Sequence, residues 1–134
     1  ARESAWLSGD LDAERETRLA MARPGLRATL LLSPHHGSRT SSSPVLLNTL
    51  RPRQVIVQSG FRNRFGHPSQ LVLNRYQERG IPWVNSPTCG AATWRSTEPQ
   101  MVHCHREAVR RYWHDPGLDA SHQQETGSLV APPD

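Results

Sequence analysis

This chain of 134 residues contains no lysine, although sixteen of its side chains are basic, because all sixteen are arginine. The formal net charge of +4 permits a nucleic-acid partner but does not establish one. An all-arginine basic set is typical of codon usage in a GC-rich genome. The same planar guanidinium groups also suit phosphate recognition. Composition alone therefore leaves both interpretations open.

The sequence also lacks a long apolar run. No segment approaches the roughly 18–20 apolar residues of a membrane span, and no signal peptide is visible. The first residue is not methionine, and we expect the chain to be a soluble piece of a longer polypeptide. This expectation leaves open a parent protein whose membrane spans lie elsewhere.

Cysteine is scarce as well. Only Cys89 and Cys104 occur, and they do not form a Cys-x-x-Cys pair. Sequence spacing does not show whether two such residues are bridged. Buried free thiols are the more frequent outcome for isolated cysteines, so we expect free thiols rather than a disulfide.

Short apolar segments alternate with short helical patterns, which predicts an α/β fold. Strands are expected at residues 4–8, 26–33, 54–59 and 81–85, and helices at 11–22, 43–50 and 69–79. Two antiparallel strands at 91–95 and 100–104 and a final helix at 107–113 complete the expected set. We expect one domain over residues 1–114 and a disordered polar tail over residues 115–134.

Potential metal ligands follow the first two expected strands. Asp10 comes after the first, and His35 and His36 come after the second. The carboxyl ends of parallel strands share one edge of a sheet, and carboxylate and imidazole groups bind zinc and similar metals. Two alternatives stay open: Asp10 could cap a helix, and the histidines could belong to a polar loop. One Asp and two His are also few ligands for a hydrolytic metal centre.

Further polar residues near the same edge are candidates for substrate binding. Hydroxyl groups after the double histidine could donate to phosphate oxygens or cap a helix, and the loop after the third strand is rich in polar side chains. The candidates are Ser38, Thr40, Ser41, Asn63, Arg64 and His67. His67 could also be a metal ligand or a general acid, or its loop could simply cap the next helix.

These motifs, in this order, resemble the C-terminal part of the metallo-β-lactamase-like domain of ComEC-type DNA-internalisation competence proteins. The resemblance covers roughly residues 4–95. The matching segments are Trp6-Leu7-Ser8-Gly9-Asp10, the acidic helix at 12–19, the stretch from Pro34 to Ser42, Leu50-Arg51-Pro52, and the stretch from Arg62 to Pro68.

The resemblance implies a fold, a function and a location. The fold would be the C-terminal half of a metallo-β-lactamase-like αββα sandwich. The domain would be the soluble part of an inner-membrane DNA-uptake protein, on its periplasmic or outer side. Its activity would be that of a metal-dependent nuclease or phosphodiesterase that degrades the non-transported DNA strand. The implied partners are DNA, the N-terminal half of the same domain and the membrane channel of the parent protein.

The resemblance also implies roles for individual residues. Asp10 would be a metal-bridging carboxylate, and one histidine of the pair would be a ligand, with His35 the first choice over His36. His67 would lie at the rim of the site, near substrate. The cofactor of the intact domain would be zinc or manganese.

One departure from the family pattern limits these expectations. The main ligand motif, His-x-His-x-Asp-His, is absent from this sequence. We therefore expect an incomplete metal shell, and little or no nuclease activity from this chain alone. One alternative is a non-catalytic, arginine-rich module that guides DNA in the same machinery. Another is a metallohydrolase for a small phosphorylated substrate.

Overall fold

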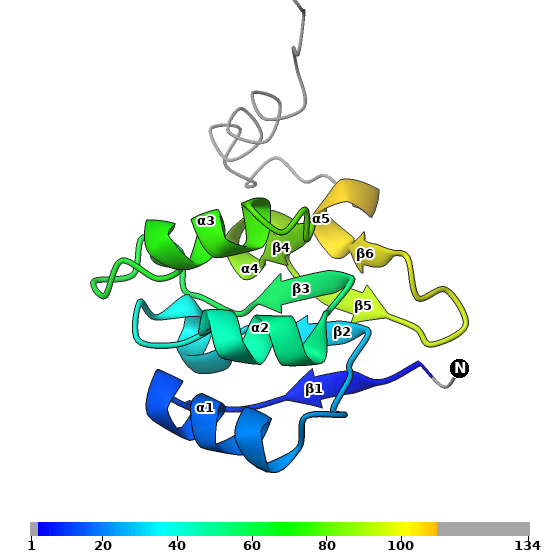
Figure 1. The fold of residues 1–134 in the computed structure, drawn as a ribbon. Helices are drawn as coiled ribbons and strands as arrows, with labels where there is room; N and C mark the ends of the chain where they lie inside the picture. Colours follow the sequence, from blue (N-terminus) through cyan, green and yellow to red (C-terminus); the bar gives the residue numbers. More distant parts are fainter. Residues whose placement is uncertain (1–2, 110–134) are drawn as a thin grey trace, which may run out of the picture.

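Four short strands form a parallel sheet in the order β1-β2-β3-β4 (Figure 1). They are β1 (Ala5–Leu7), β2 (Leu30–Leu32), β3 (Gln54–Val57) and β4 (Trp83–Asn85). The structure is a computed structural model, and it describes residues 3–109. The α/β class expected from the sequence is confirmed as a mixed structure with a parallel sheet and helices.

Three helices connect the strands: α1 (Ala13–Ala22), α2 (Pro44–Leu50) and α3 (Gln70–Gln77). Each begins at a side-chain cap, because the side chains of Asp12, Ser43 and Ser69 accept a hydrogen bond from the backbone N–H three residues on. The cap of α1 is therefore Asp12. Asp10 does not cap this helix, so the helix-capping alternative for Asp10 is removed.

The remaining elements are short. A single 3-10 turn, η1 (Pro34–Gly37), follows β2, and α4 (Ser86–Cys89) follows β4. The antiparallel hairpin β5 (Ala92–Trp94) and β6 (Val102–Cys104) leads into α5 (His105–Ala108). The last helix therefore begins two residues earlier than expected. Residues 110–113 of that expected helix, and the expected disordered tail at 115–134, lie outside the described residues.

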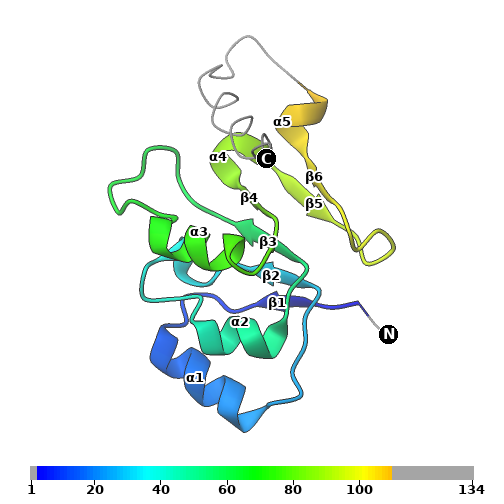
Figure 2. The same cartoon turned by 45° about the horizontal axis from the view of Figure 1, so that its top comes forward.

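The helices α1, α2 and α3 lie on one side of the sheet, and the hairpin lies on the other (Figures 1 and 2). The core fills the helix side, where apolar side chains of β2 and β3 pack against α2 and α3. Its fully buried members include Leu31, Leu46, Leu47, Leu50, Val55, Val57, Val72 and Tyr76. Their burial, at about 25 cal/mol per Å² of apolar surface, is the main stabilising contribution. It fixes the strand ends that carry the polar loops.

Cys89 and Cys104 form a disulfide, so the expectation of free thiols is wrong. The reason is the register of the hairpin, in which Ala92 pairs with Cys104. Cys89 ends α4 three residues before Ala92, and the two cysteine Cα atoms are 4.6 Å apart. Sequence spacing alone did not show that the hairpin would bring them within bridging distance.

Removing this disulfide should destabilise the chain. Cross-linking a loop of about 15 residues stabilises a fold by about 3 kcal/mol, because it restricts the unfolded chain. The double variant Cys89→Ser/Cys104→Ser should therefore lose about that much free energy of unfolding, as measured by urea denaturation. The unmodified chain in reductant is the control and should match the double variant. Equal urea midpoints with and without reductant would show that the bridge contributes nothing.

Candidate functional site

Three loops meet at the carboxyl edge of the parallel sheet. They are Gly9–Asp10 after β1, the turn η1 after β2, and the segment 60–68 after β3, which we call the Gly60–Pro68 loop. Backbone hydrogen bonds join them: His35 N donates to Gly9 O at 2.9 Å, and Ser69 N donates to Gly37 O at 2.8 Å. The structure thus brings loops that are distant in sequence to one edge, as parallel strands require.

Asp10 and His36 face each other at this edge. Nε2 of His36 lies 3.8 Å from Oδ1 of Asp10, and both side chains are more than half exposed. Nδ1 of His36 lies 2.8 Å from the carbonyl oxygen of Gln58. A carbonyl oxygen only accepts hydrogen bonds, so Nδ1 carries the proton in this contact. In the neutral ring, Nε2 of His36 then presents a lone pair toward the Asp10 carboxylate. Because Nε2 and the carboxylate oxygen are both acceptors, a proton or a cation between them is needed for a favourable contact.

This geometry fits two ligands of one cation. Two ligand atoms on a zinc ion lie about 3–4 Å apart, and a ligating histidine usually donates its other ring N–H to a carbonyl or carboxylate. Asp10 and His36 meet both conditions. Among residues 3–109, however, no three His, Cys, Asp or Glu side chains gather into a group that could hold a metal ion. The described residues therefore supply part of a metal shell.

The other two histidines lie beside this pair. The ring of His35 is 6.4 Å from that of His36 and 5.9 Å from that of His67, centre to centre. Burial lowers the pKa of His67 below its ordinary value of 6.5, and the neighbouring charges of His35 and His36 lower it further. His67 is therefore a neutral imidazole at neutral pH. The sequence favoured His35 as the metal ligand, whereas the structure places His36 next to the carboxylate.

The backbone of the turn η1 is strained. His35 (φ 48°), His36 (φ 56°) and Gly37 (φ 78°) are consecutive residues in the left-handed region. A non-glycine residue there costs about 1–2 kcal/mol, and such strain persists only where the surroundings enforce it. Strained residues of this kind cluster at functional sites. The strain is consistent with a turn whose role is to direct two imidazole groups.

The hydroxyl residues after the double histidine mostly shape the turn. Ser41 is fully buried, and its Oγ lies 2.7 Å from Pro34 O and 2.8 Å from Ser38 O. Ser38 is also buried, and its Oγ is 3.1 Å from the hydroxyl of the exposed Thr40. A substrate could therefore contact Ser41 only if the turn opened. Of Ser38, Thr40 and Ser41, only Thr40 is exposed to solvent.

Asn63 holds the Gly60–Pro68 loop closed. Its side-chain amide donates to the carbonyl oxygens of Gly60 (2.9 Å) and His67 (2.5 Å), and its Oδ1 accepts from the N–H of His67 (3.0 Å). These three hydrogen bonds position His67, and the substrate contact expected of Asn63 stays a prediction. Arg64 is exposed, and its guanidinium carbon lies 4.8 Å from the centre of the Phe65 ring.

A hollow of about 420 Å³ opens between β3, α4 and the Gly60–Pro68 loop. The residues that line it are His36, Gln58, Ser59, Gly60, Asn63, Phe65, His67 and Ser86. The Oγ of Ser59 is buried and finds no hydrogen-bond partner among the described residues. The hollow therefore combines a candidate metal ligand, a neutral imidazole and an unsatisfied hydroxyl.

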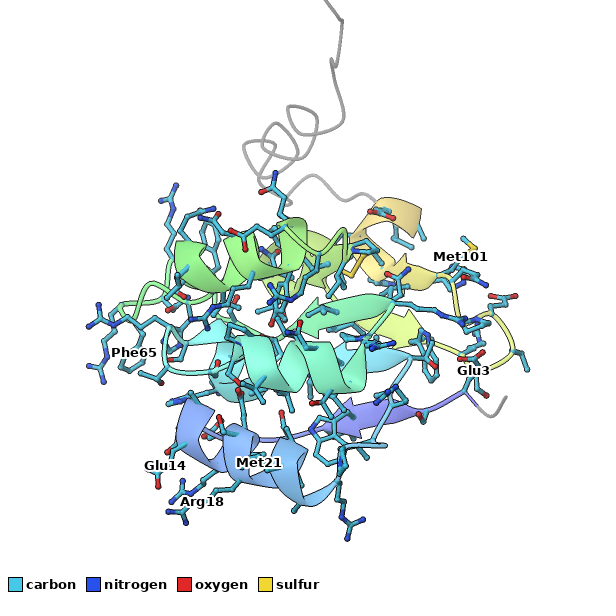
Figure 3. All side chains as sticks on the ribbon, viewed as in Figure 1. Glu3, Glu14, Arg18, Met21, Phe65 and Met101 are labelled. Atoms are coloured by element: carbon cyan, nitrogen blue, oxygen red, sulfur yellow. A yellow bond between two sulfur atoms is a disulfide. The ribbon has the colours of Figure 1, made fainter. Side chains whose placement is uncertain are left out.

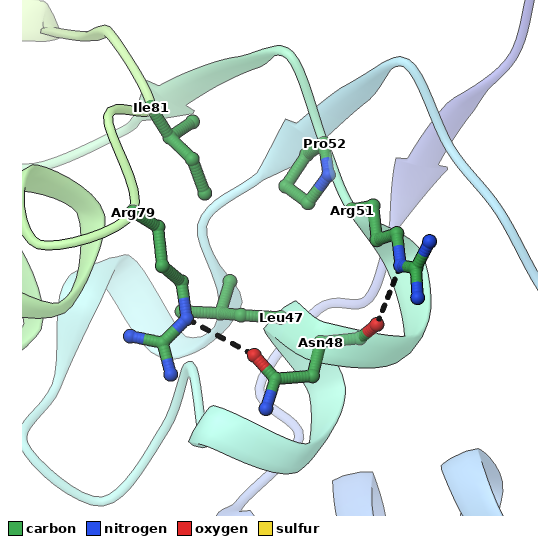
Figure 4. A pocket seen from close by; sticks show the side chains of 6 residues that line it. All are labelled: Leu47, Asn48, Arg51, Pro52, Arg79 and Ile81. Atoms are coloured by element: carbon green, nitrogen blue, oxygen red, sulfur yellow. Dashed lines mark hydrogen bonds between the residues drawn. The ribbon is translucent and has the colours of Figure 1, made fainter.

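A second hollow, of about 430 Å³, lies between the end of α2 and the segment that follows α3 (Figure 4). Arg79 Nε donates to Asn48 Oδ1 at 3.2 Å, and Arg51 Nε donates to Asn48 O at 3.4 Å. Its other lining residues are Leu47, Pro52 and Ile81. It has no carboxylate or imidazole, so it offers no group for metal binding or acid–base chemistry.

A buried residue on α1, Glu16, holds the segment after the turn η1 and was not predicted from the sequence. Its two carboxylate oxygens accept the backbone N–H groups of Ser42 (2.8 Å) and Ser43 (2.7 Å), and it is fully buried. Nearby, the hydroxyl of Tyr76 lies 2.8 Å from that of Ser33 and 2.7 Å from that of Ser42. The one signal in the sequence was the spacing of Glu16 and Ala20, which places both on the buried face of α1.

None of the helices within residues 3–109 is both long enough and apolar enough to cross a membrane. No model of a known protein family matches the chain.

Individual proteins do match. The chain is 38% identical to the competence protein ComA of Neisseria gonorrhoeae over 86 residues, which are 63% of this chain and 12% of that protein. It is 33% identical to the ComE operon protein 3 of Bacillus subtilis over 92 residues, 68% of this chain and 12% of the relative. The uncharacterized protein YcaI of Escherichia coli is 33% identical over 113 residues, 83% of this chain and 15% of the relative. The chain thus spans about an eighth of the length of these relatives, and competence proteins are among its homologues.

Proposed function

We propose that this chain, a homologue of competence proteins, is the DNA-processing part of a DNA-uptake protein in which Asp10 and His36 hold a catalytic divalent metal. The observation that carries the proposal is the pairing of the two side chains, with Nδ1 of His36 tied to a backbone carbonyl and Nε2 facing the carboxylate. The relation to competence proteins supports DNA as the substrate. The reaction would be phosphodiester hydrolysis.

We propose further that the fold is the C-terminal half of a metallo-β-lactamase-like αββα sandwich. Helices cover one face of the parallel sheet, and the only other β structure in residues 3–109, the hairpin, lies on the opposite face (Figure 2). The other layer of the sandwich would come from the rest of the parent protein. The disulfide supports a location on the periplasmic side, because disulfides persist in oxidising compartments.

The residues of the hollow have separate roles in this proposal. A bound zinc or manganese ion would activate water and stabilise charge on the phosphate. The carbonyl of Gln58 fixes the tautomer of His36, so that Nε2 remains free to ligate. The lowered pKa of His67 favours the neutral imidazole, which can accept a proton or a hydrogen bond at the rim. The hydroxyl of Ser59 is buried, so it would reach a phosphate oxygen only if the lining of the hollow opened.

Metal binding tests the proposal. Calorimetric titration of the full chain with Zn²⁺ or Mn²⁺ should show a metal site. Asp10→Asn and His36→Gln should each lower the metal affinity by about tenfold or more, which is the size of loss seen when partners of a metal site are changed. Matched controls are Glu14→Gln and His103→Gln, which change an exposed carboxylate and an exposed histidine elsewhere. Equal affinities in all five proteins would contradict the assignment.

A non-catalytic DNA-guiding module is the second candidate. The observation in its favour is that residues 3–109 contain no group of three potential metal ligands. In that case DNA binding by the chain would depend on salt but not on chelator. The double variant Asp10→Ala/His35→Ala would bind DNA as the unmodified chain does. Metal-dependent cleavage by a longer form of the protein, abolished by Asp10→Asn, would exclude this candidate.

A further inference from the structure

The tip of the Gly60–Pro68 loop carries two exposed Phe–Arg pairs that the metal proposal does not use. The guanidinium carbon of Arg62 lies 5.0 Å from the centre of the Phe61 ring, and that of Arg64 lies 4.8 Å from the Phe65 ring. Phe61 remains 51% exposed and Phe65 67% exposed. Figure 3 shows Phe65 at the outer end of the loop, away from the sheet.

The loop is braced at its base, so its tip is presented in a defined conformation. The three hydrogen bonds of Asn63 connect Gly60 to His67 across the loop. Gly37 packs against Pro68 at the far end, and Ser69 N donates to Gly37 O. A braced loop loses little conformational entropy when a ligand binds to it.

The charge of the loop selects for an anionic partner. The segment from Ser59 to Ser69 contains two arginines and no Asp or Glu. Phe65 also lines the 420 Å³ hollow, and its ring stacks on that of His67 with centres 5.7 Å apart. A ligand bound at the tip therefore continues directly into the hollow that contains His36.

We propose that this tip is a stacking platform for single-stranded nucleic acid, whose bases pack on Phe61 and Phe65 while Arg62 and Arg64 contact its phosphates. Exposed aromatic rings interleaved with arginine suit unpaired bases, because every base offers a flat face and every nucleotide a phosphate. A duplex keeps its bases stacked on each other and offers the platform only its backbone. The inference rests on the proposed function, because it specifies single-stranded DNA as the form that reaches the hollow containing His36.

Fluorescence anisotropy of the full chain in EDTA tests the platform without metal and without cleavage. The probes are a labelled thymidine 20-mer, its abasic counterpart and a duplex of equal length. The unmodified chain should bind the 20-mer more tightly than either other probe. Phe61→Ala and Phe65→Ala should each weaken 20-mer binding by about tenfold, and abasic binding by much less. Arg62→Gln/Arg64→Gln should reduce the slope of log affinity against log salt by about 1.4.

Two control variants lie elsewhere on the surface. Met101→Ala removes another exposed apolar side chain, and Arg15→Gln/Arg18→Gln removes two exposed charges on α1. Both should bind the 20-mer as the unmodified chain does. Absent 20-mer binding, equal affinity for the 20-mer and the abasic strand, preference for duplex, or unchanged binding in both Phe variants would each overturn the platform. None of these results bears on metal binding by Asp10 and His36, so the metal site and the platform fail separately.

Discussion

Replacing Glu16 with alanine should lower the free energy of unfolding by about 2–6 kcal/mol, because two buried N–H groups would each lose a partner at about 1–3 kcal/mol. Glu16 is fully buried, and its carboxylate accepts the N–H groups of Ser42 and Ser43 at the start of α2. Hydrogen bonds to a carboxylate are also stronger than those between neutral groups. Urea denaturation measures the loss.

Two further substitutions separate the causes of this effect. Glu16→Gln keeps one acceptor oxygen but brings an NH₂ group toward a backbone N–H, so its loss should lie between those of alanine and the unmodified chain. Glu14→Gln, on the exposed side of the same helix, should change stability by less than about 1 kcal/mol. If Glu16→Ala were no more destabilising than Glu14→Gln, the support that we assign to Glu16 would be wrong.

Gly37→Ala should be nearly as damaging, for a different reason. A Cβ atom at Gly37 would lie 2.7 Å from Pro68 Cβ and 3.1 Å from Pro68 Cα, and the residue has φ +78°. Left-handed strain of about 1–2 kcal/mol and overpacking of about 1–3 kcal/mol together predict a loss of about 2–5 kcal/mol. The displaced Pro68 would also move His67, so 20-mer binding should weaken.

Gly66→Ala is the matched control for this substitution. Gly66 has φ +66°, and a Cβ atom there would meet nothing within 4 Å. It should therefore lose only the strain contribution, about 1–2 kcal/mol. The difference between the two variants in urea denaturation isolates the contact between Gly37 and Pro68. Equal losses would mean that this contact does not hold the two loops together.

The sequence predicted the parts of this molecule that depend on local pattern. Alternating apolar and helical segments indicated the α/β order, and the polar residues after each strand indicated a shared edge. Parallel pairing of β1, β2 and β3 then brings Asp10, His36 and His67 to that edge. The element order and the polar strand ends could be predicted because each depends only on residues that are close together in the sequence.

The features that the sequence did not predict depend on contacts between distant segments. The Glu16 carboxylate accepts a hydrogen bond from a backbone N–H 26 residues away, and no local sequence pattern predicts such a contact. The choice between His35 and His36 depends on two consecutive left-handed residues, a conformation that histidine seldom adopts. The disulfide depended on the register of a hairpin, and the closure of the Gly60–Pro68 loop depended on the side-chain hydrogen bonds of Asn63.

The most direct test of the central claim is a zinc titration of the full chain followed by ¹⁵N NMR of the histidine side chains. We predict that Nε2 of His36 shifts on zinc binding while Nδ1 keeps its proton, and that Asp10→Asn abolishes the shift. A zinc-induced shift confined to His103 or His105, with His36 unchanged, would show that the Asp10–His36 pair does not bind metal.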